Sequence, residues 1–183
     1  MYFVNVHSLF LAVVLIAGCG NMMNDLNPSG NSKVPVVQAG TTGPAVGQNA
    51  PDFMLSDITG NSITLASVYP TTKGVIMYFS MWCPVCDDHL NQLSTTIIPA
   101  HPQFTYYAVD YVSGSVANAR NTVISNGFSG APFGVLVDVN MAVYRSYSAN
   151  MGTTVVIDAD GVIRMNEDYK DGARLQSVLA SLL

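Results

Sequence analysis

The sequence VIMYFSMWCPVC, at residues 75–86, predicts a buried strand that runs directly into a helix. Its first part, Val75 to Ser80, is almost wholly apolar, as is typical of a strand buried on both faces. From Cys86 to Ile98 the apolar residues recur at helical spacing, and the pattern stops at Pro99. Two cysteines therefore lie where the strand meets the helix.

Cys83 and Cys86 lie three residues apart at the predicted start of this helix. Free backbone N–H groups and the helix dipole stabilise an anion there, so we expect the pKa of the Cys83 thiol to be lowered. Cys86 lies one turn further in, where it is shielded and suited to resolving a mixed disulfide. Pro84 is tolerated between them because the first helical turn needs no N–H donor from it. The short spacing predicts a disulfide that can be made and broken repeatedly.

Two other interpretations of the cysteine pair compete with a redox role. A structural disulfide normally joins distant segments, and a bridge across so short a loop stabilises little. A zinc site needs a second pair of ligands at suitable spacing. Only His89 and His101 are histidines in this part of the chain, and they form no such pair. The pattern favours redox chemistry over a structural bridge, and it predicts no metal.

The rest of the sequence alternates between predicted strands and helices. One hairpin signal surrounds the turn at residues 57–61, and another surrounds residues 158–161. We expect strands at residues 53–55, 63–65, 104–109, 133–137, 153–157 and 162–166. We expect helices at residues 115–125, 141–147 and 173–183. This alternation predicts an α/β sandwich with a mixed central sheet.

The N-terminus carries the remaining cysteine. Residues 9–16 form an apolar run that is typical of a secretory signal peptide. The run is too short to span a membrane, which takes about 20 apolar residues. The sequence IAGC, from Ile16 to Cys19, resembles the lipobox of bacterial lipoproteins. This resemblance implies that residues 1–19 hold a signal peptide and that Cys19 is lipidated.

Residues 20–46 are predicted to be a flexible tether, because Gly, Asn, Ser, Pro and Thr dominate there and no aromatic residue occurs. A flexible chain of about 30 residues spans about 30 Å, which would hold a domain at residues 47–183 just off a membrane surface. Gly20 stands where an Asp often retains such lipoproteins in the inner membrane. The lipoprotein resemblance therefore favours the outer membrane.

The composition narrows the function further. The chain has 183 residues, of which 49% are hydrophobic and 10% charged, and its net charge is −5. The high hydrophobicity excludes disorder over the whole length. The excess of acidic over basic residues leaves no basic surface for a nucleic acid. The chain has three cysteines. If Cys19 is lipidated and Cys83 and Cys86 form the redox pair, no unpaired thiol is left in an oxidising compartment.

Residues 47–183 resemble the thioredoxin-like superfamily, in the TlpA/ResA-like branch of extracytoplasmic redoxin-domain proteins. The resemblance rests on four segments, Ala50–Phe53, Gly60–Leu65, Tyr78–Cys86 and Thr153–Gly161. It implies a three-layer α/β sandwich with a mixed central sheet and an N-terminal hairpin extension. It also implies thiol-disulfide exchange with other proteins in the periplasm and a membrane redox partner. No cofactor is implied beyond the redox-active disulfide itself.

The same resemblance assigns roles to residues around the cysteines. Cys83 is expected to be the nucleophile and Cys86 the resolving cysteine. A substrate groove is expected at Trp82, Pro84, Met151 and Gly152. Gly152 departs from the family pattern, in which a cis-proline stands at this position. Because a cis bond before a non-proline residue costs about 2.5–4 kcal/mol, we expect the Met151–Gly152 bond to be trans.

Two further departures concern the proton of the second thiol. Met77 stands where relatives carry a buried Asp or Asn beneath the cysteines, and it cannot accept a proton. His89 stands where the ResA-like branch often carries Glu, three residues after Cys86 and on the same helical face. His89 is therefore a candidate base for the Cys86 proton, and an exposed histidine without a role is the alternative.

Three other functions share this sequence pattern. The peroxiredoxin branch requires a PxxxTxxC pattern, to which only Ser80 and Cys83 correspond, and a separate Arg. A copper chaperone requires a wider cysteine spacing, although Met81, Met151 and His89 could supply soft ligands. A thioredoxin-like module that only binds a partner, with an inert disulfide, also stays open.

Overall fold

The structure, a computed structural model, describes residues 37–183. The predicted signal peptide, the predicted lipidation site Cys19 and the predicted tether up to residue 36 lie outside the described residues. Within residues 37–183, no helix has the length and apolar character needed to cross a membrane.

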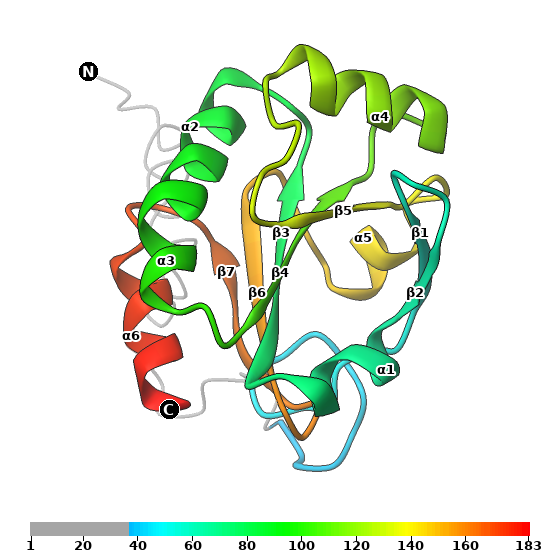
Figure 1. Cartoon of the computed structure of the whole chain (residues 1–183). Coiled ribbons are helices and arrows are strands. Elements are labelled where there is room, and N and C mark those ends of the chain that lie inside the picture. Colours follow the sequence, from blue (N-terminus) through cyan, green and yellow to red (C-terminus); the bar gives the residue numbers. More distant parts are fainter. Residues whose placement is uncertain (1–36) are drawn as a thin grey trace, which may run out of the picture. The chain divides into compact units, whose positions relative to one another are not determined.

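A seven-stranded sheet in the order β2-β1-β5-β4-β3-β6-β7 forms the centre of the domain (Figure 1). The strands are β1 (Met54–Asp57), β2 (Ser62–Thr64), β3 (Gly74–Ser80), β4 (Thr105–Asp110), β5 (Gly134–Val137), β6 (Thr153–Asp158) and β7 (Ile163–Asp168). β3, β4 and β5 are parallel, and the other pairs are antiparallel. The sheet is therefore mixed, as predicted, and the expected N-terminal hairpin, β1 and β2, extends one edge of it.

Helices cover both faces of this sheet (Figure 1). They are α1 (Leu65–Val68), η2 (Tyr69–Thr71), α2 (Pro84–Gln92), η3 (Leu93–Ile97), α3 (Ile98–Ala100), α4 (Val116–Ser125), α5 (Ala142–Ser146) and α6 (Ala173–Ser181). The side chains of β3 alternate between two apolar layers. Ile76 and Tyr78 pack with residues of α2, α3 and α6, whereas Met77 and Phe79 pack with residues of α1 and α5. The fold is the three-layer sandwich that the sequence predicts.

The helix that follows the cysteines is longer than predicted and is interrupted once. Its middle, η3, is a turn of π-helix in which the Ile98 N–H donates to the Leu93 carbonyl. Pro99 then falls at the start of the short α3, where a missing N–H costs little. The helix ends at Ala100 rather than before Pro99, because the π turn shifts the hydrogen-bond ladder by one residue.

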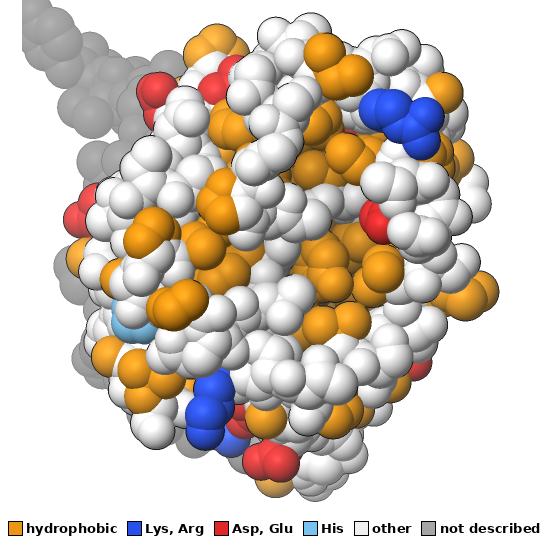
Figure 2. Space-filling view, in the orientation of Figure 1, with side chains coloured by type: hydrophobic (Ala, Val, Ile, Leu, Met, Phe, Trp, Pro, Cys, Tyr) orange, Lys and Arg blue, Asp and Glu red, His pale blue; other side chains and the backbone are white. Residues whose placement is uncertain are grey.

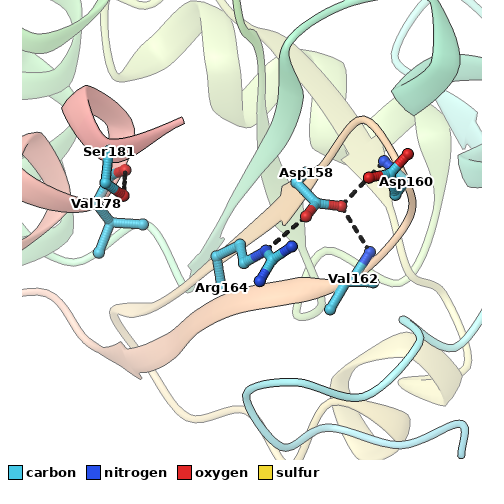
Figure 3. A network of polar contacts seen from close by, with 6 residues as sticks. All are labelled: Asp158, Asp160, Val162, Arg164, Val178 and Ser181. Carbon is cyan, nitrogen blue, oxygen red and sulfur yellow. Dashed lines mark hydrogen bonds and ion pairs between the residues drawn. The ribbon is translucent and has the colours of Figure 1, made fainter. Parts of the chain in front are cut away.

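The hairpin between β6 and β7 is closed by Asp158 (Figure 3). Asp158 Oδ1 accepts the backbone N–H of Asp160 at 3.0 Å and that of Val162 at 2.9 Å. Its Oδ2 pairs with the guanidinium of Arg164 on β7. The predicted turn at residues 158–161 is therefore fixed by one nearly buried carboxylate. This hairpin sets the position of β6, which packs directly against β3.

Part of the predicted tether contacts the domain. Asn166 of β7 donates its side-chain N–H to the Pro44 carbonyl at 2.8 Å. The Gly47 N–H donates to the Ile163 carbonyl at 2.9 Å, and Asn49 forms an isolated bridge with Val162. Pro44, within the range predicted to be the tether, therefore contacts β7. A run of small polar residues can add to a sheet edge through its backbone, and composition does not reveal this.

The surface has few charged side chains, in keeping with the composition. Figure 2 shows uncharged polar groups and apolar side chains over most of one face, with single charged residues between them. Around the cysteines the exposed large apolar side chains include Met81, Val85 and Met151. The surroundings of the cysteines are therefore predominantly apolar.

Candidate active site

The turn between β3 and α2 is held in an unusual backbone conformation. Trp82 has a φ of 58°, in the left-handed region that costs a non-glycine residue about 1–3 kcal/mol. Two hydrogen bonds hold it there. Its backbone N–H donates to Ser80 Oγ at 3.1 Å, and its indole N–H donates to Asp110 Oδ2 at 2.9 Å. This turn places Cys83 directly before the first residue of α2.

Asp110 is a structural support of the site that the sequence did not single out. It is fully buried at the end of β4. Its Oδ1 accepts the backbone N–H groups of Val112 and Ser113 at 3.0 and 2.9 Å, and its Oδ2 accepts the Trp82 indole. An Asp at the end of an apolar strand was the available signal, but its partner Trp82 lies 28 residues earlier in the chain.

The structure brings Cys83 and Cys86 together at the start of α2, as predicted. Cys83 is the N-cap residue, and its sulfur accepts the Cys86 backbone N–H at 3.3 Å. The two sulfur atoms lie 2.8 Å apart as free thiols. Cys86 is fully buried, whereas Cys83 is partly exposed. Pro84 occupies the first turn of α2. Access from solvent is therefore to Cys83.

The pKa values of the two thiols move in opposite directions. Burial raises the pKa of Cys83, and its hydrogen bond with Cys86 adds to the rise. Desolvation acts on Cys86 in the same way, but hydrogen bonds from Cys83, from backbone N–H groups and from Tyr78 outweigh it and lower the pKa of Cys86. The two thiols together thus lose their first proton readily, whereas the second proton is lost only at a higher pH. The sequence predicts a lowered pKa for Cys83, but in this dithiol it is the pKa of Cys86 that is lowered, by its hydrogen bonds with the Cys83 side chain and with backbone N–H groups.

Tyr78, not Met77, is the β3 residue that faces the second cysteine. Met77 lies in the apolar layer on the other face of the sheet. Tyr78 packs with Cys86, and its hydroxyl lies 2.9 Å from His89 Nδ1. Burial lowers the pKa of His89, against the opposing effect of the Asp88 charge. His89 therefore lies within the site as a neutral imidazole at pH 7, although through Tyr78 rather than in direct contact with a sulfur.

Gly152 stands where the family pattern places a cis-proline, and the Met151–Gly152 bond is trans, as expected. No peptide bond is cis between residues 37 and 183, and Gly152 has a φ of 83°. Its N–H donates to the Phe79 carbonyl at 2.9 Å. A Cβ at this position would lie 3.8 Å from the Tyr78 hydroxyl and 4.0 Å from His89 Nδ1. Gly152 is buried behind these two side chains, whereas Met151 before it is 39% exposed.

Two carboxylates follow Cys86 on α2. Asp87 Oδ1 is buried without a hydrogen-bond partner. Desolvation, and then the neighbouring Asp88 charge, raise the pKa of Asp87. A negative charge near the helix start complements the helix dipole but opposes a thiolate.

The described residues do not assemble a metal site around the cysteines. Between residues 37 and 183, no group of three or more His, Cys, Asp and Glu side chains is placed to hold a metal ion. His101 lies apart from the pair, where its ring packs against Phe104 and its carbonyl accepts the Tyr106 hydroxyl. Of the two histidines considered from the sequence, the structure brings only His89 to the cysteines.

A strand, a tight turn and a helix that starts with two thiols, on a mixed sheet between helical layers, define a redoxin of the thioredoxin-like class. The chain belongs to the AhpC/TSA family, whose model matches residues 46–166. It is similar to the thiol-disulfide oxidoreductase ResA of Geobacillus kaustophilus, with 27% identity over 127 residues that cover 67% of this chain and 69% of the relative. ResA of Geobacillus thermodenitrificans is 28% identical over the same shares.

Solved structures share the fold. One is a secreted disulfide oxidoreductase of Mycobacterium tuberculosis homologous to DsbE, with a TM-score of 0.54 and 20% identity over 70% of this chain and 95% of that one. Another, proposed to be the thiol:disulfide interchange protein DsbE of Chlorobium tepidum, has a TM-score of 0.63 and 22% identity over 75% and 97%. The chain is thus a redoxin-domain oxidoreductase, homologous to the ResA thiol-disulfide oxidoreductases.

Proposed function

We propose that the chain exchanges thiols and disulfides with protein substrates through Cys83 and Cys86. The observation that carries the proposal is the pair of sulfur atoms, 2.8 Å apart at the start of α2, with only Cys83 open to solvent. A structural cysteine pair gains nothing from such exposure, whereas an exchange reaction needs one accessible sulfur and one protected sulfur.

The geometry supports a two-step reaction. When the shared proton moves to Cys86, Cys83 becomes a thiolate that accepts the Cys86 backbone N–H. This thiolate attacks a substrate disulfide, forms a Cys83–substrate bond and releases one substrate thiolate, which takes up a proton. Cys86 then attacks Cys83 and releases the second substrate thiol. The cysteine pair is oxidised to a disulfide and the substrate disulfide is reduced; the opposite direction uses the same steps in reverse.

The exposed residues beside Cys83 suit a substrate segment with apolar side chains. Trp82, Pro84, Met151 and Gly152 are the groove residues proposed from the family pattern. Met151 is exposed, and Trp82 fixes the turn before Cys83. Gly152 is buried and contributes through the backbone. We assign to Met151 a contact with the substrate and to Trp82 and Gly152 the shape of the site.

We also propose where the chain acts in the cell. The apolar N-terminal segment and the IAGC sequence support export and lipidation at Cys19, with the domain on the periplasmic face of a membrane and the outer membrane favoured. A membrane redox partner would then restore the cysteine pair after each cycle. Incorporation of labelled palmitate tests the anchor: the wild-type chain is expected to become labelled, and Cys19→Ser is expected to stay unlabelled.

Reduction of insulin by the full chain, regenerated by a dithiol, tests the exchange reaction. We expect Cys83→Ser to abolish turnover and Cys86→Ser to trap a mixed disulfide at Cys83, visible as a mass increase that a reductant reverses. Cys19→Ser is the matched control, because it removes a thiol outside the site and should leave turnover unchanged. Insulin reduction that neither Cys83→Ser nor Cys86→Ser changes would contradict the proposal and favour the binding-module interpretation.

Peroxide consumption separates the peroxiredoxin alternative. Each arginine between residues 37 and 183 donates to an oxygen away from the cysteines: Arg120 to Ile58, Arg145 to Asn140, Arg164 to Asp158 and Arg174 to Glu167. The described residues therefore place no arginine beside Cys83 for peroxide binding. Peroxide consumption that continued in Cys86→Ser at the wild-type rate would contradict the proposal of thiol-disulfide exchange.

A further inference from the structure

A hydrogen-bonded tyrosine and histidine lie behind the inner cysteine. The Tyr78 hydroxyl lies 2.9 Å from His89 Nδ1. Tyr78 belongs to the same buried cluster as Cys86, and it helps to lower the pKa of the Cys86 thiol. Tyr78 is only 1% exposed. The ring of Tyr169 fixes both side chains, with centroids 4.6 Å from His89 and 6.0 Å from Tyr78. The hydroxyl is therefore held against an imidazole nitrogen, on a residue of the buried cluster that contains the Cys86 thiol.

In the second step of exchange, Cys86 attacks the mixed disulfide at Cys83, and its thiol must lose a proton to do so. In the dithiol, the hydrogen bond between the two sulfur atoms helps to lower the pKa of Cys86. Once Cys83 is bonded to a substrate, it has no proton left to donate. Cys86 is fully buried, and desolvation then raises its pKa without this compensation. Cys86 must still lose its proton to attack, so another acceptor is required.

Among the titratable groups around the two cysteines, one is suited to accept the proton of Cys86. Burial raises the pKa of Tyr111, beyond β4, and of Tyr169, beyond β7, to about 12 in each case, so both stay protonated. On α2, desolvation and the charge of Asp88 raise the pKa of Asp87, and neither carboxylate forms a hydrogen bond with a cysteine in the structure. His89 is neutral at pH 7, since burial lowers its pKa.

We infer that the Tyr78 hydroxyl passes the proton of Cys86 to His89 during the attack on the mixed disulfide, a step that rests on the proposed exchange function. The Cys86 thiol gives its proton to the Tyr78 oxygen while the Tyr78 proton moves to His89 Nδ1. Cys86 bonds to Cys83, the Cys83–substrate bond breaks, and the substrate leaves as a thiolate. The imidazolium returns its proton to that thiolate or to water. Tyr78 ends as it began, because burial raises its pKa and a free tyrosinate is not formed.

A reaction in two observable phases tests this relay. The full chain carrying Cys19→Ser, fully reduced, is mixed with 4,4′-dithiodipyridine, a neutral disulfide that releases a coloured thiopyridone at each step. The first release reports attack by Cys83, and the second reports attack by Cys86. We expect Tyr78→Phe and His89→Gln each to slow the second release by about tenfold or more, as loss of a general base does, and to leave the first nearly unchanged.

The pH profile and a matched control complete the test. The second release in the wild type should follow the ionisation of His89, whereas in either variant it should rise only at the higher pH at which the Cys86 thiol ionises. Tyr169→Phe is the control, because its hydroxyl donates to Gln92 at 2.9 Å rather than to His89; it should keep the wild-type profile. The second release in the double variant should be no slower than in Tyr78→Phe alone, since both substitutions interrupt the same proton path.

The outcomes separate the two proposals. A wild-type chain with no release, or equal release after Cys83→Ser, overturns the exchange function and the relay with it. A normal first release, with a second release and pH profile unchanged in Tyr78→Phe and His89→Gln, overturns the relay alone. Effects of the two substitutions that multiply in the double variant also overturn it. Urea unfolding of each variant shows whether the compared proteins are folded. If Tyr78→Phe does not fold, His89→Gln alone still tests the relay.

Discussion

Proline at position 152, where the resemblance to the TlpA/ResA-like branch implies a proline, should destabilise this chain. Gly152 has a φ of 83°, and proline is confined to a φ near −65°. Proline would also remove the N–H that donates to the Phe79 carbonyl at 2.9 Å, in a buried place. The lost hydrogen bond costs about 0.5–1.5 kcal/mol, and the backbone conflict brings the total to about 3 kcal/mol or more. Gly152→Ala should cost less, about 1–2 kcal/mol, because it keeps the N–H and meets only the cost of a positive φ.

Urea unfolding of the reduced protein measures both substitutions. Trp82 is the single tryptophan of the chain and lies beside Cys83, so its fluorescence reports the site, and circular dichroism reports the whole fold. With a denaturant slope of about 2 kcal/mol per molar, 3 kcal/mol lowers the midpoint by about 1.5 M for Gly152→Pro. The shift for Gly152→Ala should be about half as large.

Gly60→Ala is the matched control. Gly60 lies in the β1–β2 turn with a φ of 95°, and a Cβ there would meet no atom within 4 Å. It should show the same backbone cost as Gly152→Ala and no change in the two thiopyridone releases. A Gly152→Pro chain as stable as the wild type would refute the reasoning, because the loop would then adopt the family's proline conformation without loss.

Three further predictions concern stability. Asp158→Ala should lower the free energy of unfolding by about 2–3 kcal/mol, since it removes two turn hydrogen bonds and an ion pair from a nearly buried carboxylate; Arg164→Met, at the exposed end of that pair, should cost less than about 1 kcal/mol in the same urea titration. Because the folded state holds His89 with a lowered pKa, the unfolded chain binds the proton first as pH falls below about 6.5, and stability is lost there; unfolding midpoints from pH 8 to 5 should fall less in His89→Gln. The raised pKa of Asp87 means that its charge costs stability above the carboxyl range and that the cost disappears on protonation; Asp87→Asn should therefore raise stability at pH 7, by less than about 1 kcal/mol at this half-exposed place, and an unchanged or lower midpoint would contradict the assigned desolvation.

The strand, the turn and the cysteine pair were predictable because their signals are local. An apolar run followed by helical spacing fixes β3 and α2 within a few residues. The apolar sequence of β3 does not indicate which side chains face which helical layer, since all of its residues are buried. The family pattern directed attention to Met77, yet the alternation of β3 turns Tyr78 toward Cys86 and Met77 toward α5.

The supports of the site were not predictable because they join distant parts of the chain. Asp110 holds Trp82 across 28 positions, and Tyr169 packs on His89 from the far end of β7. The Pro44 carbonyl meets Asn166 across 122 positions. Each contact depends on the sheet order, which composition and spacing do not determine. The thiol pKa values depend on a shared proton, which appears only when the distance between the two sulfur atoms is known.

The surroundings of positions 152 and 77 bear on the proposed proton path through Tyr78 and His89. A Cβ at position 152 would lie about as close to the Tyr78 hydroxyl as to His89 Nδ1, 3.8 and 4.0 Å away. A larger ring there would lie against the Tyr78 hydroxyl and the His89 imidazole. An acid at position 77 would point into the opposite layer, among Phe79, Val143 and Tyr147, and could not reach those groups. The proposed proton path through Tyr78 and His89 therefore uses no acid at position 77, and the positive φ at position 152 favours glycine there.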